Sequence, residues 1–198
     1  MRDVEALQRL SRSPHWVWGA INPVTKLLLT LDVGDRTLAM AQRVVHQIVQ
    51  VLAPGCVPLF LTDGFTEYTT ALLTHYGQWD QSPRQRAQGP APQPRWIPLP
   101  GLLYAQVVKT VRRRRLVRVR RRVVFGTLEA IQQVLAACGW QIQTAFVERL
   151  NLTIRQHVAA AGRRVSTLCK GEDGMRQQLA LYHVYYNDAS YCPISLCR

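Results

Sequence analysis

The chain has 198 residues, of which 47% are hydrophobic, and its 25 Lys and Arg against 12 Asp and Glu give a net charge of +13. A chain of this length can bury one sizeable core, and no apolar run approaches the roughly 20 residues that cross a bilayer. We therefore expect one domain over residues 1–198 and no membrane partner. Charges near the amino terminus argue against a secretory signal, and the five scattered cysteines lack zinc-site spacing, which favours a cytoplasmic protein with reduced thiols.

The first predicted elements are a β-hairpin and a helix. Two β-favouring runs, 15–21 and 27–33, flank an NPVTK turn and predict two antiparallel strands. From 37 to 52, apolar residues recur at helical spacing, with Thr37 as the N-cap and a Pro-Gly pair as the stop.

A short buried strand and a second helix come next. The run VPLFL at 57–61 is too short for a helix, and Asp63 falls just past its end. We expect this strand to lie alongside the hairpin in one mixed sheet, followed by a helix at about 66–75. At about 81–100 we predict an extended proline-rich insertion, because six of the eleven prolines lie there. Trp96, inside this insertion, is a candidate for contact with a partner.

The positive charge is concentrated in the middle of the chain. Between residues 81 and 128 there are twelve basic residues and no acidic one. Two β-like runs, 101–111 and 115–125, lie there, and we predict an arginine-rich strand at about 112–125. Alternation places Val117, Val119, Val123 and Phe125 on one of its faces, which Arg121 alone interrupts. It places Arg118, Arg120 and Arg122 on the other face. Contact with nucleic-acid backbone is favoured over a membrane surface and over a merely solvated strand face. The candidate residues are Arg112, Arg113, Arg114, Arg115, Arg118, Arg120 and Arg122.

Three helices complete the chain. The first, 127–139, has Thr127 as a cap, Gly139 as a stop and an apolar side made of Leu128, Ile131, Val134, Leu135 and Cys138. The second, about 144–161, carries a polar stripe of Glu148, Asn151 and Arg155 opposite a buried stripe of Val147, Leu150, Ile154 and Val158. The last runs over 174–187.

Three segments resemble, in order, the characteristic blocks of bacterial insertion-sequence DDE transposases of the type encoded by the shortest insertion elements. They are HWVWGAINPVTKLLLTLDVGDRT, FLTDGFTEYTTAL and TAFVERLNLTIRQHVAAAGRRVSTLCKGED, and the likeness covers about residues 14–187. The resemblance implies a ribonuclease-H-like α/β fold, a mixed sheet flanked by helices. It also implies cutting and strand transfer of DNA at transposon ends and target, a nucleoid-associated bacterial protein, and it allows a homo-oligomer.

The resemblance also implies a metal site. Phosphodiester cutting and joining is helped by two divalent ions, and Mg²⁺ or Mn²⁺ prefers carboxylate oxygens. By resemblance, Asp63 and Glu148 are the second and third acids of the catalytic triad, and Asn151 and Arg155 belong to the nucleic-acid-binding set. The alternatives are an Asx turn or N-cap for Asp63, and a solvated helix partner of Arg149 or Arg155 for Glu148.

No residue of this chain clearly matches the first acid of the family's triad. In the family it lies on a strand upstream of the block that corresponds here to WVWGAI, where this chain offers only Asp3 in a helix-like context. Asp32 is the nearest strand-borne substitute, with a surface strand residue as its alternative. We therefore expect a copy that lacks its first strand, with weakly held metal and impaired catalysis. The remaining alternatives are a non-catalytic DNA-binding remnant and a basic RNA-binding protein.

Overall fold

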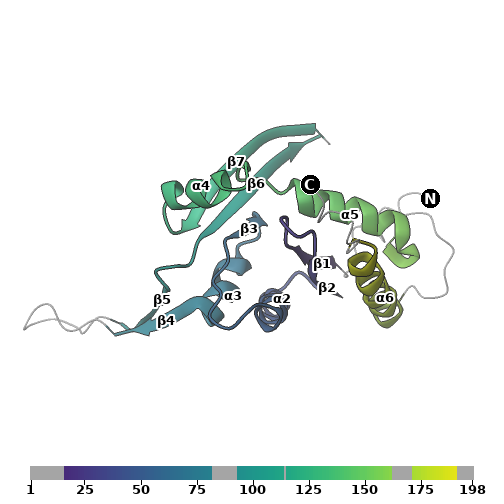
Figure 1. Cartoon of the computed structure of the whole chain (residues 1–198), viewed down its shortest axis with the longest axis horizontal. Helices are drawn as coiled ribbons and strands as arrows, with labels where there is room; N and C mark the ends of the chain where they lie inside the picture. Colours follow the sequence, from purple (N-terminus) through teal and green to yellow (C-terminus); the bar gives the residue numbers. More distant parts are fainter. Residues whose placement is uncertain (1–15, 82–92, 114, 162–170, 191–198) are drawn as a thin grey trace, which may run out of the picture. The chain divides into compact units, whose positions relative to one another are not determined.

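The computed structural model describes residues 16–81, 93–113, 115–161 and 171–190 (Figure 1). Within these ranges it is a mixed α/β structure with five α-helices and small sheets, which confirms the predicted α/β class. The chain divides into two compact units, unit 1 with residues 1–51 and 145–198 and unit 2 with residues 52–144. Whether they form one domain stays a prediction. No helix in the described ranges combines the length and apolar content needed to cross a membrane.

Unit 1 begins with the predicted hairpin. Strand β1 (Trp16–Ile21) pairs antiparallel with β2 (Leu28–Gly34). The side chain of Asn22 shapes the turn, because its Oδ1 accepts the backbone N–H of Val24 at 2.9 Å and that of Thr25 at 3.4 Å. This Asx turn is the physical basis of the Asn-Pro signal in the sequence.

Helices cover the hairpin of unit 1. Helix α2 (Leu38–Val51) starts at the predicted Thr37 cap, whose hydroxyl accepts the N–H of Met40 at 3.4 Å. Helix α5 (Ala145–His157), the short 3₁₀ helix η1 (Ala159–Ala161) and helix α6 (Glu172–Ser190) complete the unit. The core of the unit consists of Leu28, Val33, Leu150, Ile154, Val158, Leu179 and Tyr182. The predicted buried stripe of α5 is thereby confirmed for three of its four members, and Val147 is half-buried.

Unit 2 is built on a three-stranded sheet. Strand β3 (Phe60–Asp63) pairs parallel with β6 (Tyr104–Arg112), and β6 pairs antiparallel with β7 (Arg115–Phe125). The prediction that β3 lies alongside the β1–β2 hairpin is wrong, since its ladder partner is β6. Helix α3 (Glu67–Tyr76) follows β3 as predicted, and helix α4 (Leu128–Ala136) follows β7.

One face of this sheet is covered by α4 and the segment that follows it. The core there consists of Ala105, Val107, Ile131, Leu135 and Ile142. Thr127 caps α4 as predicted, with its hydroxyl accepting the N–H of Ala130 at 3.2 Å. The predicted apolar side of this helix is partly wrong, because Leu128 and Val134 are exposed, as is Cys138 just beyond its end.

A second hairpin was missed in the proline-rich segment. Strand β4 (Gly77–Asp80) pairs antiparallel with β5 (Arg95–Pro98), so residues 95–98 form a strand rather than part of an extended loop. Proline is tolerated in a two-stranded ribbon because each strand has an edge that needs no hydrogen bond. Residues 82–92 of the predicted insertion lie outside the described residues.

Candidate nucleic-acid interface

The outer half of the β6–β7 hairpin extends beyond the core of unit 2 (Figure 1). Side chains are buried from Tyr104 to Val107 in β6, whereas those from Lys109 to Arg112 and from Arg115 to Arg122 in β7 are exposed. Because this two-stranded part of the hairpin is exposed on both faces, it contributes little to the hydrophobic core of unit 2. Its exposed arginines are therefore candidates for contact with a partner.

The alternating arginines of β7 lie on one face, as predicted. Arg118, Arg120 and Arg122 are exposed and stand opposite Thr110, Val108 and Gln106 of β6. We call these three side chains the arginine face. Alternate residues of a strand are roughly 6.7 Å apart, close to the roughly 6.8 Å that two successive base steps occupy along one DNA strand.

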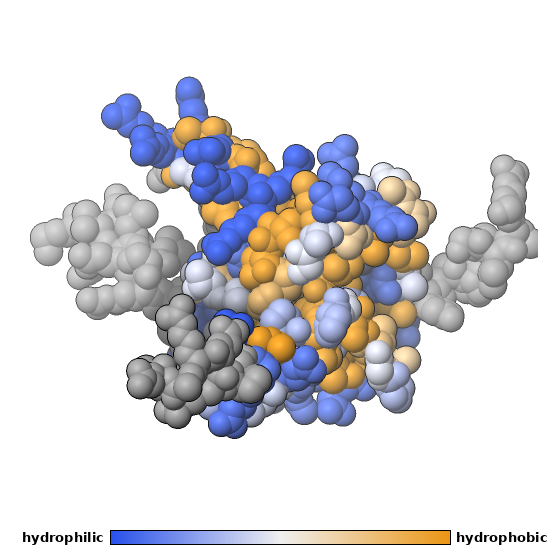
Figure 2. Space-filling view, turned by 90° about the vertical axis from the view of Figure 1, so that its left-hand side faces the viewer, coloured by the Kyte–Doolittle hydropathy of each residue, from blue (hydrophilic) through white to orange (hydrophobic). Residues whose placement is uncertain are grey.

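More arginines gather where the hairpin turns. Arg112 and Arg115 are cross-strand partners, and Arg113 has a left-handed backbone with φ of 48°. Arg114, also predicted to bind nucleic acid, lies outside the described residues. Hydrophilic side chains project from the upper part of the molecule in Figure 2, the part that β6 and β7 occupy in Figure 1. In the described ranges no carboxylate forms an ion pair with an arginine of this turn or of the arginine face.

The opposite face of the hairpin carries the arginine that interrupts the apolar pattern of the sequence. Val123, Arg121 and Val119 pair with Ala105, Val107 and Lys109 and therefore share this face. Arg121, which interrupts the apolar pattern, donates from Nε to the carbonyl oxygen of Ile142 at 2.9 Å. The prediction for Phe125 is wrong. A register shift beside Tyr104 turns its ring to the other face, where its centroid lies 5.9 Å from that of Tyr104.

Asp63 is the last residue of β3, at the carboxyl end of a strand in a parallel pair. Its side chain is exposed, and its Oδ1 accepts the backbone N–H of Phe65 at 3.1 Å. The Asx turn that was the alternative reading of Asp63 is therefore present. Gly64 follows it, and a Cβ there would lie 3.1 Å from a methyl group of Val108, so a larger residue would require Val108 to shift slightly.

A buried polar network lies next to Asp63. The hydroxyl of Tyr104 is 2.9 Å from Oγ1 of Thr62 and accepts from Nε2 of Gln106 at 2.8 Å. Gln106 also donates to the carbonyl oxygen of Phe65 at 3.2 Å, which connects β6 to the turn after Asp63. Burial raises the pKa of the Tyr104 phenol, and the negative charge of Asp63 adds to this effect, while hydrogen bonds with its neighbours oppose it.

Replacing Tyr104 by Phe is expected to lower the free energy of unfolding by about 1–2 kcal/mol, since Gln106 loses a buried partner. The raised pKa sets the sign of the pH dependence. Stability from the neutral phenol is complete below the unfolded-state pKa of about 10 and is lost as pH rises through the higher folded-state pKa. The free energy of unfolding, measured with urea at several alkaline pH values, should therefore fall more steeply with pH for the wild type than for Tyr104→Phe. Equal losses would contradict this account of the network.

Glu148 and the residues that follow it on its stripe lie in unit 1. Glu148 is exposed in the first turn of α5, Asn151 is half-buried and Arg155 is exposed in the last turn. A carboxylate at this end of a helix interacts favourably with the helix dipole. Asp63 belongs to unit 2 and Glu148 to unit 1.

Asp32 is buried, with 3% of its surface exposed, so the alternative of a surface strand residue is wrong. Its Oδ2 lies 2.9 Å from Nε of Arg43 and accepts from Nε2 of Gln47 at 3.1 Å. Its Oδ1 accepts the N–H of Val33 at 2.8 Å and lies 3.3 Å from Nε of Arg176, without the alignment of a hydrogen bond. Both oxygens are therefore engaged by donors within unit 1.

These partners of Asp32 were missed by sequence reasoning. Arg43 is a polar residue within an apolar-periodic helix, and Arg176 is in the first turns of the last helix. The distance in sequence from Asp32 to either arginine matches no known pattern of paired residues, so the sequence does not indicate that they are its partners. Arg176 also donates from Nη2 to the carbonyl oxygen of Val33 at 3.1 Å and to Glu172 at 2.7 Å. The cluster therefore joins β2, α2 and α6.

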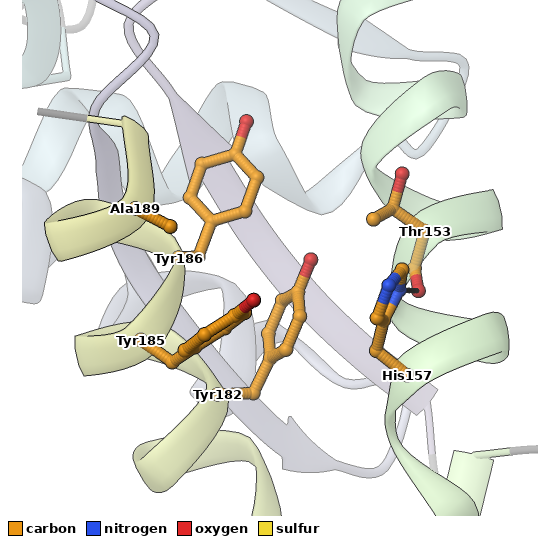
Figure 3. A pocket seen from close by; sticks show the side chains of 6 residues that line it. All are labelled: Thr153, His157, Tyr182, Tyr185, Tyr186 and Ala189. Carbon is orange, nitrogen blue, oxygen red and sulfur yellow. Dashed lines mark hydrogen bonds between the residues drawn. The ribbon is translucent and has the colours of Figure 1, made fainter. Parts of the chain in front are cut away.

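Unit 1 also contains a pocket of about 120 Å³ between α5 and α6 (Figure 3). It is lined by Thr153, His157, Tyr182, Tyr185, Tyr186 and Ala189. Nδ1 of His157 lies 2.9 Å from the carbonyl oxygen of Thr153 and donates to it. The lining contains no carboxylate, lysine or arginine, so it offers aromatic surface rather than an ionic site.

No group of three or more His, Cys, Asp or Glu suited to hold a metal ion occurs within 16–81, 93–113, 115–161 and 171–190. The chain matches no model of a known protein family, no curated protein and no solved structure.

Proposed function

We propose that the chain is a DNA-binding protein of the insertion-sequence transposase type, and that the arginine face contacts the phosphate backbone. The observation that carries this proposal is the exposed β6–β7 ribbon with its arginines in regular alternation. Phosphate contacts by arginine supply affinity without sequence preference, and the guanidinium geometry suits phosphate oxygens. The net charge of +13 adds attraction over longer distances.

The order of elements supports the finer proposal of a ribonuclease-H-like fold. A hairpin, β1 and β2, is followed by α2, then β3, α3 and a strand, β6, that is parallel to β3. Parallel strands joined through a helix are the unit from which such α/β folds are made. Under this proposal Asp63 lies where ligand-binding residues of α/β sheets lie, at the carboxyl end of a strand.

Salt dependence of duplex binding tests the proposed function. Each neutralised phosphate releases counterion, so the logarithm of the association constant should fall by about 0.9 per contact and per decade of salt. A fluorescently labelled duplex titrated with the full chain at several salt concentrations gives this slope by anisotropy. Weak binding that is insensitive to salt would contradict a phosphate-binding role. Double-stranded RNA is added as a competitor of the labelled DNA duplex. Displacement of the duplex by a lower concentration of RNA than of unlabelled DNA would favour the alternative of a basic RNA-binding protein.

The resemblance implies a metal-dependent reaction, but the described part of the chain contains no group of three or more His, Cys, Asp or Glu that could hold the metal. Asp32 does not fit the role of a ligand, because it forms an ion pair with Arg43 and accepts hydrogen bonds from Gln47 and Val33. Asp63 and Glu148 are exposed carboxylates, the ligand type that Mg²⁺ and Mn²⁺ prefer. We keep these two as the proposed metal ligands and derive no reaction step from them.

Asp63→Asn and Glu148→Gln are each expected to weaken Mn²⁺ binding by at least about tenfold, because even outer-shell partners of a metal site contribute that much. Free Mn²⁺ in a titration of the full chain can be followed by electron paramagnetic resonance. Asp35→Asn is the matched control, since Asp35 is an exposed carboxylate outside the proposed pair. If all three variants bind Mn²⁺ as the wild type does, the proposed pair of ligands is wrong.

A further inference from the structure

The β4–β5 hairpin carries two exposed tryptophans at directly opposite positions. Trp79 and Trp96 are cross-strand partners, with ring centroids 5.7 Å apart in an edge-to-face arrangement. They remain 57% and 51% exposed. A pair of this kind stabilises an isolated two-stranded ribbon, but that role leaves more than half of each indole in contact with water.

The backbone beside Trp96 is closely packed against the end of α3. A Cβ on Gly77 would lie 3.1 Å from a ring carbon of Trp96 and 2.4 Å from the carbonyl oxygen of Leu73. Glycine is therefore required at this position, because a Cβ would overlap the carbonyl oxygen of Leu73. The backbone N–H of Leu99, just after β5, donates to the carbonyl oxygen of Tyr76 at 2.8 Å, which attaches the hairpin to the end of α3. The strand that carries Trp96 is therefore attached to α3 through the backbone.

The charges of this hairpin and of the sequence between its two strands favour a polyanion. Arg95 is exposed on β5, next to Trp96. The sequence that joins the two strands contains Arg84 and Arg86, and no acidic residue occurs from 81 to 94. Asp80, opposite Arg95 in the ladder, is the carboxylate of the ribbon itself. Exposed aromatic rings beside cationic residues are the combination on which unpaired bases stack while the backbone is neutralised.

We propose that Trp79 and Trp96 form a stacking platform for single-stranded nucleic acid, separate from the arginine face. The inference rests on the proposed function, because both require nucleic acid as the partner. Unpaired bases are favoured over duplex because the faces of paired bases are already covered by their neighbours in the stack. A platform of this kind would hold strands that are opened or frayed, whereas the arginine face holds the backbone.

The test uses a labelled oligothymidylate of about 20 nucleotides, long enough for a stacking site and its flanking backbone contacts. Trp79→Leu and Trp96→Leu in the full chain are each expected to weaken its binding by about fivefold or more, since base–aromatic stacking contributes that much per base. Trp96→Phe keeps an aromatic face and should retain most of the affinity. Trp16→Leu is the matched control, because Trp16 is also 51% exposed and already has the Arg36 guanidinium 5.0 Å from its ring.

Duplex binding by the same variants separates the outcomes. The platform predicts that Trp96→Leu leaves duplex affinity unchanged and abolishes part of the quenching of tryptophan fluorescence by the oligothymidylate. Unchanged single-strand affinity in both leucine variants would overturn the platform, as would an equal loss toward duplex, which would indicate a general disruption of unit 2. Salt-sensitive duplex binding by the wild type, without any binding of oligothymidylate, would refute the platform alone. No binding to either probe would refute the proposed function as well.

Discussion

Replacing Arg118, Arg120 and Arg122 together by glutamine is expected to weaken duplex DNA binding by on the order of 10²- to 10³-fold at about 0.1 M salt, and to reduce the salt slope by about three. Glutamine keeps the length and polarity of the side chain and removes the charge. The three positions are exposed, so the substitutions should leave the fold of unit 2 intact. Anisotropy titrations at several salt concentrations measure both quantities.

Arg121 provides the control for this prediction. It lies between Arg120 and Arg122 on the same strand, but on the opposite face, where it donates to the carbonyl oxygen of Ile142. Arg121→Gln should therefore lower stability slightly and leave the salt slope close to that of the wild type. A slope that falls equally in Arg120→Gln and Arg121→Gln would mean that net charge, rather than the arginine face, determines binding.

Asp32→Asn is expected to lower the free energy of unfolding by about 2–4 kcal/mol, since it removes the charge that compensates two guanidinium groups around a buried position. Arg43 and Arg176 are 48% and 38% exposed in their side chains, so water can partly replace the lost carboxylate, which places the effect below that of a fully buried pair. Urea unfolding followed by circular dichroism measures the change.

Asp35→Asn serves as the matched control for Asp32→Asn. The two residues are three positions apart in the chain, but Asp35 is exposed, and surface substitutions usually change stability by less than about 0.5 kcal/mol. An Asp32→Asn variant as stable as the wild type would show that the cluster with Arg43 and Arg176 does not stabilise unit 1.

Local signals in the sequence were sufficient for most individual elements. The Asn22 turn, the Thr37 cap and the Thr127 cap each act within a few residues, so they can be identified without knowing the tertiary structure. The alternating arginines of β7 were also predictable, because side chains of a strand alternate between faces. These are the features on which the proposed interface depends.

Features that depend on distant partners were not predictable in the same way. β3 pairs with β6, and nothing in the run 57–61 indicates which strand will neighbour it. Phe125 changes face because of a register shift, which interrupts the alternation that the prediction used. Asp32 is buried because Arg43 and Arg176 come from two different helices, and its own neighbours in the sequence do not reveal this.

Protection of arginines from chemical modification by bound DNA tests the central claim most directly. The full chain would be treated with phenylglyoxal, with and without a saturating duplex, and modification at each arginine measured by mass spectrometry. The account predicts strong protection of Arg118, Arg120 and Arg122, and unchanged modification of Arg43, which is engaged with Asp32 in unit 1. Protection elsewhere in the chain, with the arginine face fully modified in the complex, would contradict it.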